Sequence, residues 1–140
     1  MKKVLFVCHG NICRSPMAEY IFKYMTGGEY IISSRATSTE EIGNDIYPEI
    51  KKVLDKHGIP YKRHYAKQIT KDDYNYYDYI IAFDDYNVLN IKRLIGDDRK
   101  VMKITKEGVA DPWYTRDFEK AYHDTYIGCK NLYEFIKKDI

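Results

Sequence analysis

The feature that most constrains this chain is a short loop that joins an apolar segment directly to a helix near the start of the sequence. Residues 4–7 are Val, Leu, Phe and Val, a run that predicts a buried strand. Pro16 suits the first turn of a helix, where its missing N–H breaks no hydrogen bond, and Ser15 is a typical N-cap residue. We therefore predict a tight strand–loop–helix turn, whose loop consists of His9, Gly10, Asn11, Ile12, Cys13, Arg14 and Ser15.

This loop carries groups that can bind an oxyanion and attack it. A helix N-terminus presents unpaired N–H groups and a partial positive charge, which bind phosphate without any special side chain. Gly10 permits a sharp turn, and Asn11 tolerates a left-handed backbone. Arg14 can hold two phosphate oxygens in its planar fork. The same positive charges favour the thiolate form of Cys8, to which Ser15 can donate a hydrogen bond, so we interpret Cys8 as a nucleophile rather than a packing residue.

Strand and helix patterns alternate along the rest of the chain. Strands are predicted at residues 4–7, 30–33, 79–83 and 100–104, and helices from Pro16 to Gly27 and over 46–57, 88–95 and 118–136. Such alternation is typical of a parallel sheet with helices on both faces, in which ligands bind at the carboxyl ends of the strands. We expect residues 1–140 to form a single three-layer α/β domain around a four-stranded parallel twisted sheet.

Composition argues against several classes of function. The net charge is +2 and the charges are interspersed, which does not favour nucleic acid or a membrane surface as a partner. No segment is apolar for long enough to span a bilayer, and residues 4–7 are too short a run for a signal peptide. The three cysteines, Cys8, Cys13 and Cys129, do not resemble the disulfide framework of a secreted protein. We therefore expect a cytoplasmic protein, in which Cys129 packs on a helix face.

The loop and several later segments resemble the low-molecular-weight protein tyrosine phosphatases. That family carries Cys-x-Gly-Asn-Ile-Cys-Arg-Ser-Pro just after its first strand, which matches residues 8–16 here. The similarity runs nearly end to end, through residues 36–38, 41–43, 57–60, 64, 66–70, 83–84 and 111–114. The resemblance implies the phosphotyrosine protein phosphatase I-like fold, which is flavodoxin-like in its layers.

The resemblance also implies a reaction in two steps, with no metal and no cofactor. Cys8 would attack phosphotyrosine and form a phosphocysteine, while Arg14 and the loop hold the transferring phosphoryl group. Asp111 would protonate the leaving phenolate and then act as a base toward water. The chemistry itself calls for such an acid, because a phenolate leaves poorly unless it is protonated. Taken alone, the pair Asp111-Pro112 is also a common turn.

Further roles follow from the resemblance. Asn11, Ser34 and His64 match a buried polar network that supports the loop, although an exposed position for His64 is equally open. His9, Ile12, Trp113 and Tyr114 would form the walls of the pocket, and aromatic walls suit an aryl phosphate. His9 departs from the apolar or tyrosyl residue that is usual there, so contact with the substrate and exposure to solvent are both open.

Two other residues match recurrent positions of the family. Cys13 would form a reversible disulfide with Cys8, because a neighbouring thiol can trap the sulfenic acid that peroxide forms on a reactive thiolate. Asp84 lies at a predicted strand end, and we leave it outside the catalytic set.

Three alternatives share the loop. Protein arginine phosphatases resemble this chain but carry threonine where Ile12 lies, and a branched apolar side chain should crowd a guanidinium. Arsenate reductases need a relay of further cysteines, and only Cys129 lies outside the loop. A phosphocarrier needs neither an arginine clamp nor a general acid, yet Arg14 and Asp111 are both present, and a non-catalytic phosphotyrosine reader would usually have lost Cys8 or Asp111. We therefore favour tyrosine-phosphorylated proteins as substrates, with inorganic phosphate and similar oxyanions as inhibitors.

Overall fold

The computed structural model describes residues 1–139. Its elements, in chain order, are β1 (Lys3–Cys8), α1 (Arg14–Thr26), β2 (Ile31–Ala36), α2 (Pro48–Lys56), α3 (Lys71–Tyr76), β3 (Tyr79–Ala82), α4 (Asp85–Ile95), β4 (Val101–Lys103), α5 (Pro112–Thr115) and α6 (Phe118–Lys138).

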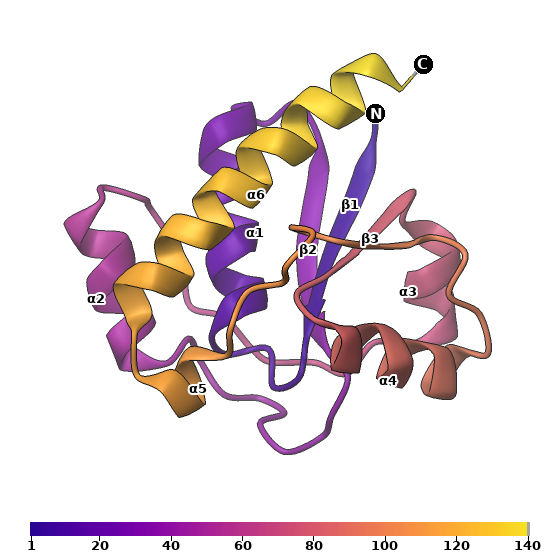
Figure 1. Ribbon diagram of the computed structural model, residues 1–140, viewed down its shortest axis with the longest axis horizontal. Coiled ribbons are helices and arrows are strands. Elements are labelled where there is room, and N and C mark those ends of the chain that lie inside the picture. Colours follow the sequence, from indigo (N-terminus) through magenta and orange to yellow (C-terminus); the bar gives the residue numbers. More distant parts are fainter. Residues whose placement is uncertain (140) are drawn as a thin grey trace.

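The strands form one parallel sheet in the order β2-β1-β3-β4 (Figure 1). Strand β1 pairs on both sides, with Val4 opposite Ile32 of β2 and Tyr79 of β3. Helices α1, α2 and α6 cover one face of the sheet, while α3 and α4 cover the other (Figure 1). The predicted α/β architecture is therefore confirmed.

Alternation along β1 explains why both faces are covered. Val4 and Phe6 point into the larger core with α1 and α6, and Leu5 and Val7 point into the smaller core under α4. All four side chains are fully buried, as expected for a central strand of a parallel sheet. Cys8 follows on the side of the larger core, so the strand itself sets the direction of its thiol.

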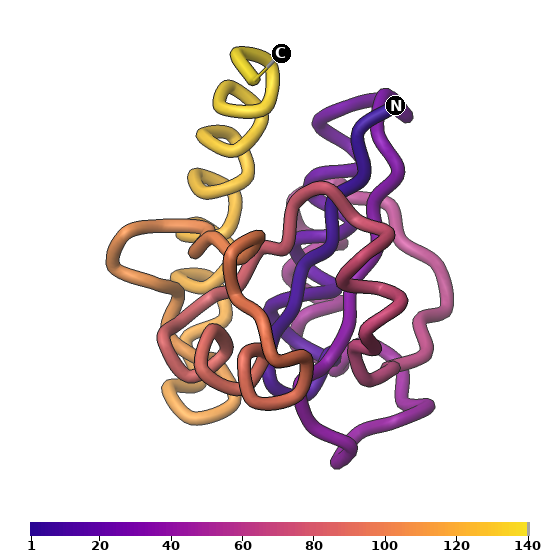
Figure 2. The backbone as a smooth tube through the Cα atoms, turned by 90° about the vertical axis from the view of Figure 1, so that its right-hand side faces the viewer, coloured from indigo at the N-terminus to yellow at the C-terminus, as the bar shows by residue number. Residues whose placement is uncertain are grey.

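The three loops that build the site leave the same edge of the sheet. They follow β1, β3 and β4, whose carboxyl ends are adjacent because the strands are parallel. The N-terminus and the last turn of α6 lie at the opposite end of the molecule (Figures 1 and 2). No helix within residues 1–139 combines the length and apolar character needed to cross a membrane.

Several predicted boundaries are wrong. Helix α1 begins at Arg14 with Cys13 at its N-cap, not at Pro16 with Ser15 at the cap, and no side chain caps it. Ser15 does not serve as the N-cap because its backbone N–H donates a hydrogen bond to the sulfur of Cys8 at 3.4 Å. Strand β2 is shifted to Ile31–Ala36, and β4 is shorter than expected.

Two short helices, α3 and α5, were not predicted from the sequence. Helix α3 begins with a capping box in which Thr70 and Asp73 exchange hydrogen bonds. Helix α5 begins at Asp111, whose side chain accepts the N–H of Trp113, with Pro112 in the first helical position. Both start signals are visible in the sequence, but each helix is too short for hydrophobic periodicity to reveal it.

Candidate active site

The loop after β1 is held in place by backbone hydrogen bonds from neighbouring segments. The carbonyls of Cys8 and His9 accept the N–H groups of Thr37 and Ser38 at 2.9 and 3.0 Å. The carbonyl of Ile12 accepts the N–H of Tyr47 at 2.9 Å. The left-handed residue of the loop is Asn11, with φ +60°, as its residue type predicted. Gly10 has no positive φ, and a Cβ added to it would make only ordinary contacts with the side chains of Glu41 and Ile12, so neither the backbone conformation nor the surrounding protein atoms require glycine there.

The sulfur of Cys8 lies at the start of α1, next to Ser15. The Sγ atom is 3.0 Å from the Oγ of Ser15 and also accepts the Ser15 N–H at 3.4 Å. Asn11 donates from Nδ2 to the same Oγ at 2.8 Å. The hydroxyl of Ser15 also lies 3.4 Å from the carbonyl of Arg35, so its proton can be donated either to that carbonyl or to the sulfur.

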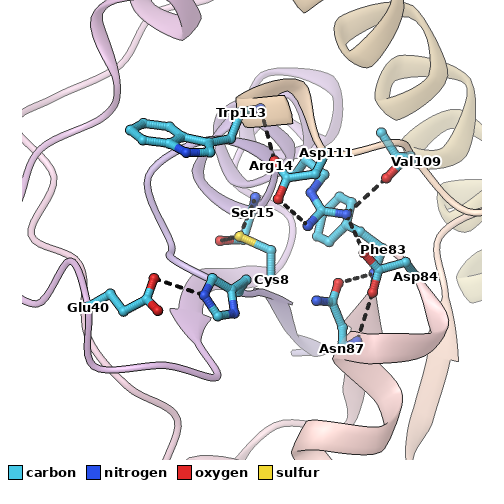
Figure 3. A network of polar contacts seen from close by, with 11 residues as sticks. Cys8, Arg14, Ser15, Glu40, Phe83, Asp84, Asn87, Val109, Asp111 and Trp113 are labelled. Atoms are coloured by element: carbon cyan, nitrogen blue, oxygen red, sulfur yellow. Dashed lines mark hydrogen bonds and ion pairs between the residues drawn. The ribbon is translucent and has the colours of Figure 1, made fainter. Parts of the chain in front are cut away.

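Arg14 lies between two acidic side chains (Figure 3). Its Nη1 donates to Asp84 at 2.7 Å and to the carbonyl of Val109 at 2.9 Å, and its Nη2 donates to Asp111 at 3.3 Å. Burial by itself lowers the pKa of Arg14, but the nearby Cys8, Asp111 and Asp84 outweigh it and raise the pKa. The guanidinium is therefore charged and fixed in direction.

Asp111 reaches this site from a distant part of the chain. It follows β4 and caps the single turn of α5, with its Oδ1 accepting the N–H of Trp113 at 3.0 Å. Its side chain is 23% exposed, which leaves one edge of the carboxylate open to the pocket. Cys8 and Asp111 line the same cavity, of about 100 Å³.

The four residues predicted as pocket walls all lie at this cavity. His9, Ile12, Trp113 and Tyr114 all line it. Two further wall residues, Glu40 and Glu41, were missed, because they come from the loop after β2. The ring Nε2 of His9 lies 3.0 Å from a carboxylate oxygen of Glu40, so His9 is at the rim, paired and about half exposed.

The predicted support residues meet around Asn11. Its Nδ2 donates to Ser34 at 3.0 Å, its Oδ1 accepts the N–H of Lys67, and its carbonyl lies 2.7 Å from Nε2 of His64. Burial lowers the pKa of His64, so the ring is neutral and is assigned as the donor in that contact. Glu19, which was not predicted, completes the network by accepting from Ser34 at 2.6 Å.

Asp84 joins the site to the start of α4 through its two carboxylate oxygens. One of its oxygens accepts from Arg14, and the other accepts the N–H of Asn87 at 2.8 Å, which caps α4. Its sequence position was recognised, but contact with Arg14, 70 positions away, has no local signal.

The remaining site residue, Cys13, is a buried free thiol beside the same cavity. Burial, and then the proximity of Cys8 and Asp111, raise the pKa of the Cys13 thiol far above its ordinary value. The Cys13 thiol therefore stays protonated at neutral pH. Within residues 1–139, no three His, Cys, Asp or Glu side chains come together as metal ligands would.

The geometry places a buried thiol at a helix N-terminus and brings an arginine and a carboxylate to the same cavity, which is the arrangement that a cysteine-dependent phosphatase needs. A family model described as low molecular weight phosphotyrosine protein phosphatase matches residues 3–140. The chain is 38% identical to a low molecular weight phosphotyrosine protein phosphatase of Gallus gallus, over 96% of this chain and 95% of the relative. It is 37% identical to the low molecular weight protein-tyrosine-phosphatase PtpA of Staphylococcus aureus, over 99% of this chain and 96% of the relative.

A solved structure agrees in fold as well. The low molecular weight protein tyrosine phosphatase SP-PTP of Streptococcus pyogenes superposes with a TM-score of 0.92 at 42% identity, covering 99% of both chains. The chain belongs to the low molecular weight phosphotyrosine protein phosphatase family, and it is an enzyme of that class. The resemblance read from the loop is thus confirmed.

Proposed function

We propose that this protein hydrolyses phosphotyrosine in proteins, and small aryl phosphates, through a phosphocysteine formed on Cys8. The observation that carries the proposal is the single narrow cavity that Cys8 shares with Asp111 and Arg14. A nucleophile, a proton donor and a cation face one small space, so a phosphate monoester bound there meets all three. No step calls for a metal, because Arg14 and the loop N–H groups supply the positive charge.

In the first step the thiolate of Cys8 attacks phosphorus. A sulfur–phosphorus bond forms, the phosphorus–phenol oxygen bond breaks, and the protonated carboxyl of Asp111 gives its proton to the leaving oxygen. Arg14 and the N–H groups at the start of α1 hold the remaining phosphoryl oxygens. Because Arg14 already donates to Asp84, its guanidinium is oriented before the substrate arrives.

In the second step water attacks the phosphocysteine. Asp111, now a carboxylate, takes a proton from the water, and the sulfur–phosphorus bond breaks to release phosphate. Ser15 stabilises the departing thiolate, because its hydroxyl lies 3.0 Å from the sulfur. Asn11, Ser34 and His64 keep the loop in the shape that both steps require.

The shape of the cavity supports an aryl ester as substrate. Cys8 is 3% exposed, so the ester must carry its phosphate down to a buried sulfur. Trp113 and Tyr114 supply aromatic surface above it, which suits a phenyl ring. Ile12 also lines the cavity and has no hydrogen-bonding group for a guanidinium, which disfavours phosphoarginine.

Two further parts of the proposal concern the setting of the enzyme. The substrates are tyrosine-phosphorylated proteins, and inorganic phosphate or a similar oxyanion competes for the same loop. We place the enzyme in the cytoplasm, where reducing conditions keep Cys8 and Cys13 as free thiols.

A side-by-side turnover assay tests the proposal. The wild-type enzyme is expected to hydrolyse a phosphotyrosine peptide and to leave phosphoserine, phosphoarginine and arsenate unchanged. Cys8→Ser should abolish turnover yet still bind inorganic phosphate, whereas Cys129→Ala removes a thiol outside the cavity and serves as the matched control. Turnover by Cys8→Ser, or a preference for phosphoarginine, would overturn the assignment.

A further inference from the structure

Tyr47, just before α2, lies where two loops of the site meet. Its backbone N–H donates to the carbonyl of Ile12 in the phosphate-binding loop at 2.9 Å. Its side-chain Oη accepts a hydrogen bond from Nη2 of Arg116 at 2.9 Å. Arg116 directly follows α5, the single helical turn whose N-cap is Asp111. One residue thus contacts both the loop of the nucleophile and the loop of the acid.

Arg116 holds a backbone conformation that its side chain disfavours. Its φ is +60°, and Asn11 is the only other non-glycine residue with a positive φ in the part of the chain described. Glycine or asparagine fits such a position better than arginine. Residues in such conformations persist where the surroundings hold them, and they cluster at functional sites. Here the N–H of Arg116 closes α5 on the carbonyl of Pro112 at 2.9 Å.

The side chain of Arg116 is held by aromatic rings. Its guanidinium lies 5.4 Å from the ring centre of Tyr47 and 5.1 Å from that of Phe118. The Tyr47 ring in turn meets the edge of Trp113 at 5.1 Å and stacks on Phe118 at 6.0 Å. Tyr47 is therefore in contact with Trp113 inside the turn that follows Asp111, and with Arg116 and Phe118 just after it.

This contact matters because α5 has little structure of its own. It spans four residues, and Trp113, Tyr114, Thr115 and Arg116 are all exposed. A helix of one turn has almost no intrinsic stability. The position of Asp111 relative to Cys8 therefore depends on what fixes the two ends of the turn, which are Arg14 at the start and Tyr47 at the finish.

We propose that Tyr47 and Arg116 are positioning residues, which form a tether that sets where the carboxyl of Asp111 stands above Cys8. The inference rests on the proposed function, in which Asp111 is the proton donor. Proton transfer requires a donor within hydrogen-bond reach of the leaving oxygen, and a displacement of about 1 Å can cost about 100-fold in rate. Loss of the tether should therefore slow the reaction only where protonation of the leaving group is needed.

The test compares esters that differ in leaving group. Tyr47→Phe removes the acceptor hydroxyl and keeps the ring, while Arg116→Asn removes the donor and keeps a residue that tolerates a positive φ. Each is expected to lower kcat/KM for phenyl phosphate about tenfold, and to change it less than about twofold for an ester of a very acidic phenol. Arg116→Lys, which keeps the cation, should recover part of the loss.

Two further measurements separate positioning from a general disturbance. Inhibition by inorganic phosphate should be unchanged, because the N–H of Tyr47 that supports the loop survives in both variants. The double variant should be no worse than either single variant, since the two act through one contact. Tyr126→Phe, a change of the same kind at an exposed position on α6, is the control.

Equal losses for both esters, additive losses in the double variant, or kinetics identical to wild type would each overturn the tether. Asp111→Asn measured in the same assay keeps this apart from failure of the proposed function. If that variant shows no dependence on the leaving group, the role of Asp111 itself is wrong. If it does and the tether variants behave like wild type, only the tether is wrong.

Discussion

Cys8, the proposed nucleophile, and Asp111, the proposed acid, lie in two regions of opposite character. In the phosphate-binding loop, Asn11 and Ser15 are fully buried and Arg14 is 2% exposed. In the loop that carries Asp111, Trp113 is 43% and Tyr114 79% exposed. The interior network therefore fixes one half of the site, and contacts at the rim fix the other.

The difference has a consequence for mutation. Removing a buried polar partner leaves other groups unsatisfied and costs stability, whereas changes at an exposed turn cost little. Substitutions in the first region should therefore reduce both stability and activity. Substitutions in the second region should reduce activity alone.

Asp111→Asn should give the largest loss of activity, with the smallest accompanying change in stability. We expect a loss of about 10²–10⁴ in kcat/KM for phosphotyrosine, because the proton donor is removed. For an ester of a very acidic phenol the loss should be far smaller. Urea unfolding should show a midpoint close to that of wild type, because the side chain is partly exposed and the amide can still accept the Trp113 N–H. A large loss of stability would contradict the expectation that substitutions in the exposed region reduce activity alone.

Asn11→Ala should affect both properties. The change removes hydrogen bonds to Ser15, Ser34 and the N–H of Lys67, and places alanine at a φ of +60°. We expect the free energy of unfolding to fall by about 2–3 kcal/mol, and kcat/KM to fall about 10- to 100-fold as the loop loses its shape. Asn44→Ala, at an exposed position, is the matched control. An inactive variant with wild-type stability would contradict the expectation.

Cys13→Ser tests whether the buried region also protects the nucleophile. Peroxide should convert Cys8 to a sulfenic acid, which Cys13 attacks with loss of water to form a disulfide. After peroxide and then reductant, wild type should regain most of its starting activity, and Cys13→Ser should regain little of its own. Because burial raises the pKa of Cys13, disulfide formation should become faster as the pH rises. Equal recovery by both proteins would exclude the disulfide.

His64 should give the smallest effect, on stability alone. Burial lowers the pKa of this ring from its ordinary value of 6.5, so below that pH the unfolded chain binds a proton before the folded chain does. The contribution of His64 to the free energy of unfolding is complete above the unfolded-state pKa of 6.5. It is lost as the pH falls through the lower pKa of the folded state. Urea unfolding between about pH 7.5 and about pH 5.5 should show falling stability, and His64→Gln should flatten the fall. The nearby carboxylate of Asp45 remains ionised over this range, because burial raises its pKa but hydrogen bonds from Lys51 and from the N–H groups of His64 and Ile46 outweigh burial and lower it.

The sequence predicts the buried half of the site better than the exposed half, for a physical reason. Residues 8–15 are contiguous, so their types and spacing carry the chemistry directly. Asp111 was identified only through the resemblance, because Asp-Pro also marks ordinary turns. Asp84 and its partner Arg14 are 70 positions apart, and Tyr47 and its partner Arg116 are 69 positions apart. No local sequence pattern predicts contacts between residues so distant in the chain.

The errors at the ends of elements have a similar origin. Ser15 has the right side chain for an N-cap, yet its N–H is turned to the sulfur of Cys8, and the helix starts earlier. A ligand-binding loop thus overrides the usual start signals. The order of the four strands likewise depends on crossovers that the alternation of elements does not specify.

The place of β1 in the sheet carries one more implication. With β2 on one flank and β3 on the other, the strand that ends in Cys8 has neighbours along its whole length. Opening of a sheet begins at its margins, which here are β2 and β4. Cys8 therefore ends the strand whose amide hydrogens should exchange most slowly with solvent. Local opening of the edge strands should leave the position of its sulfur unchanged.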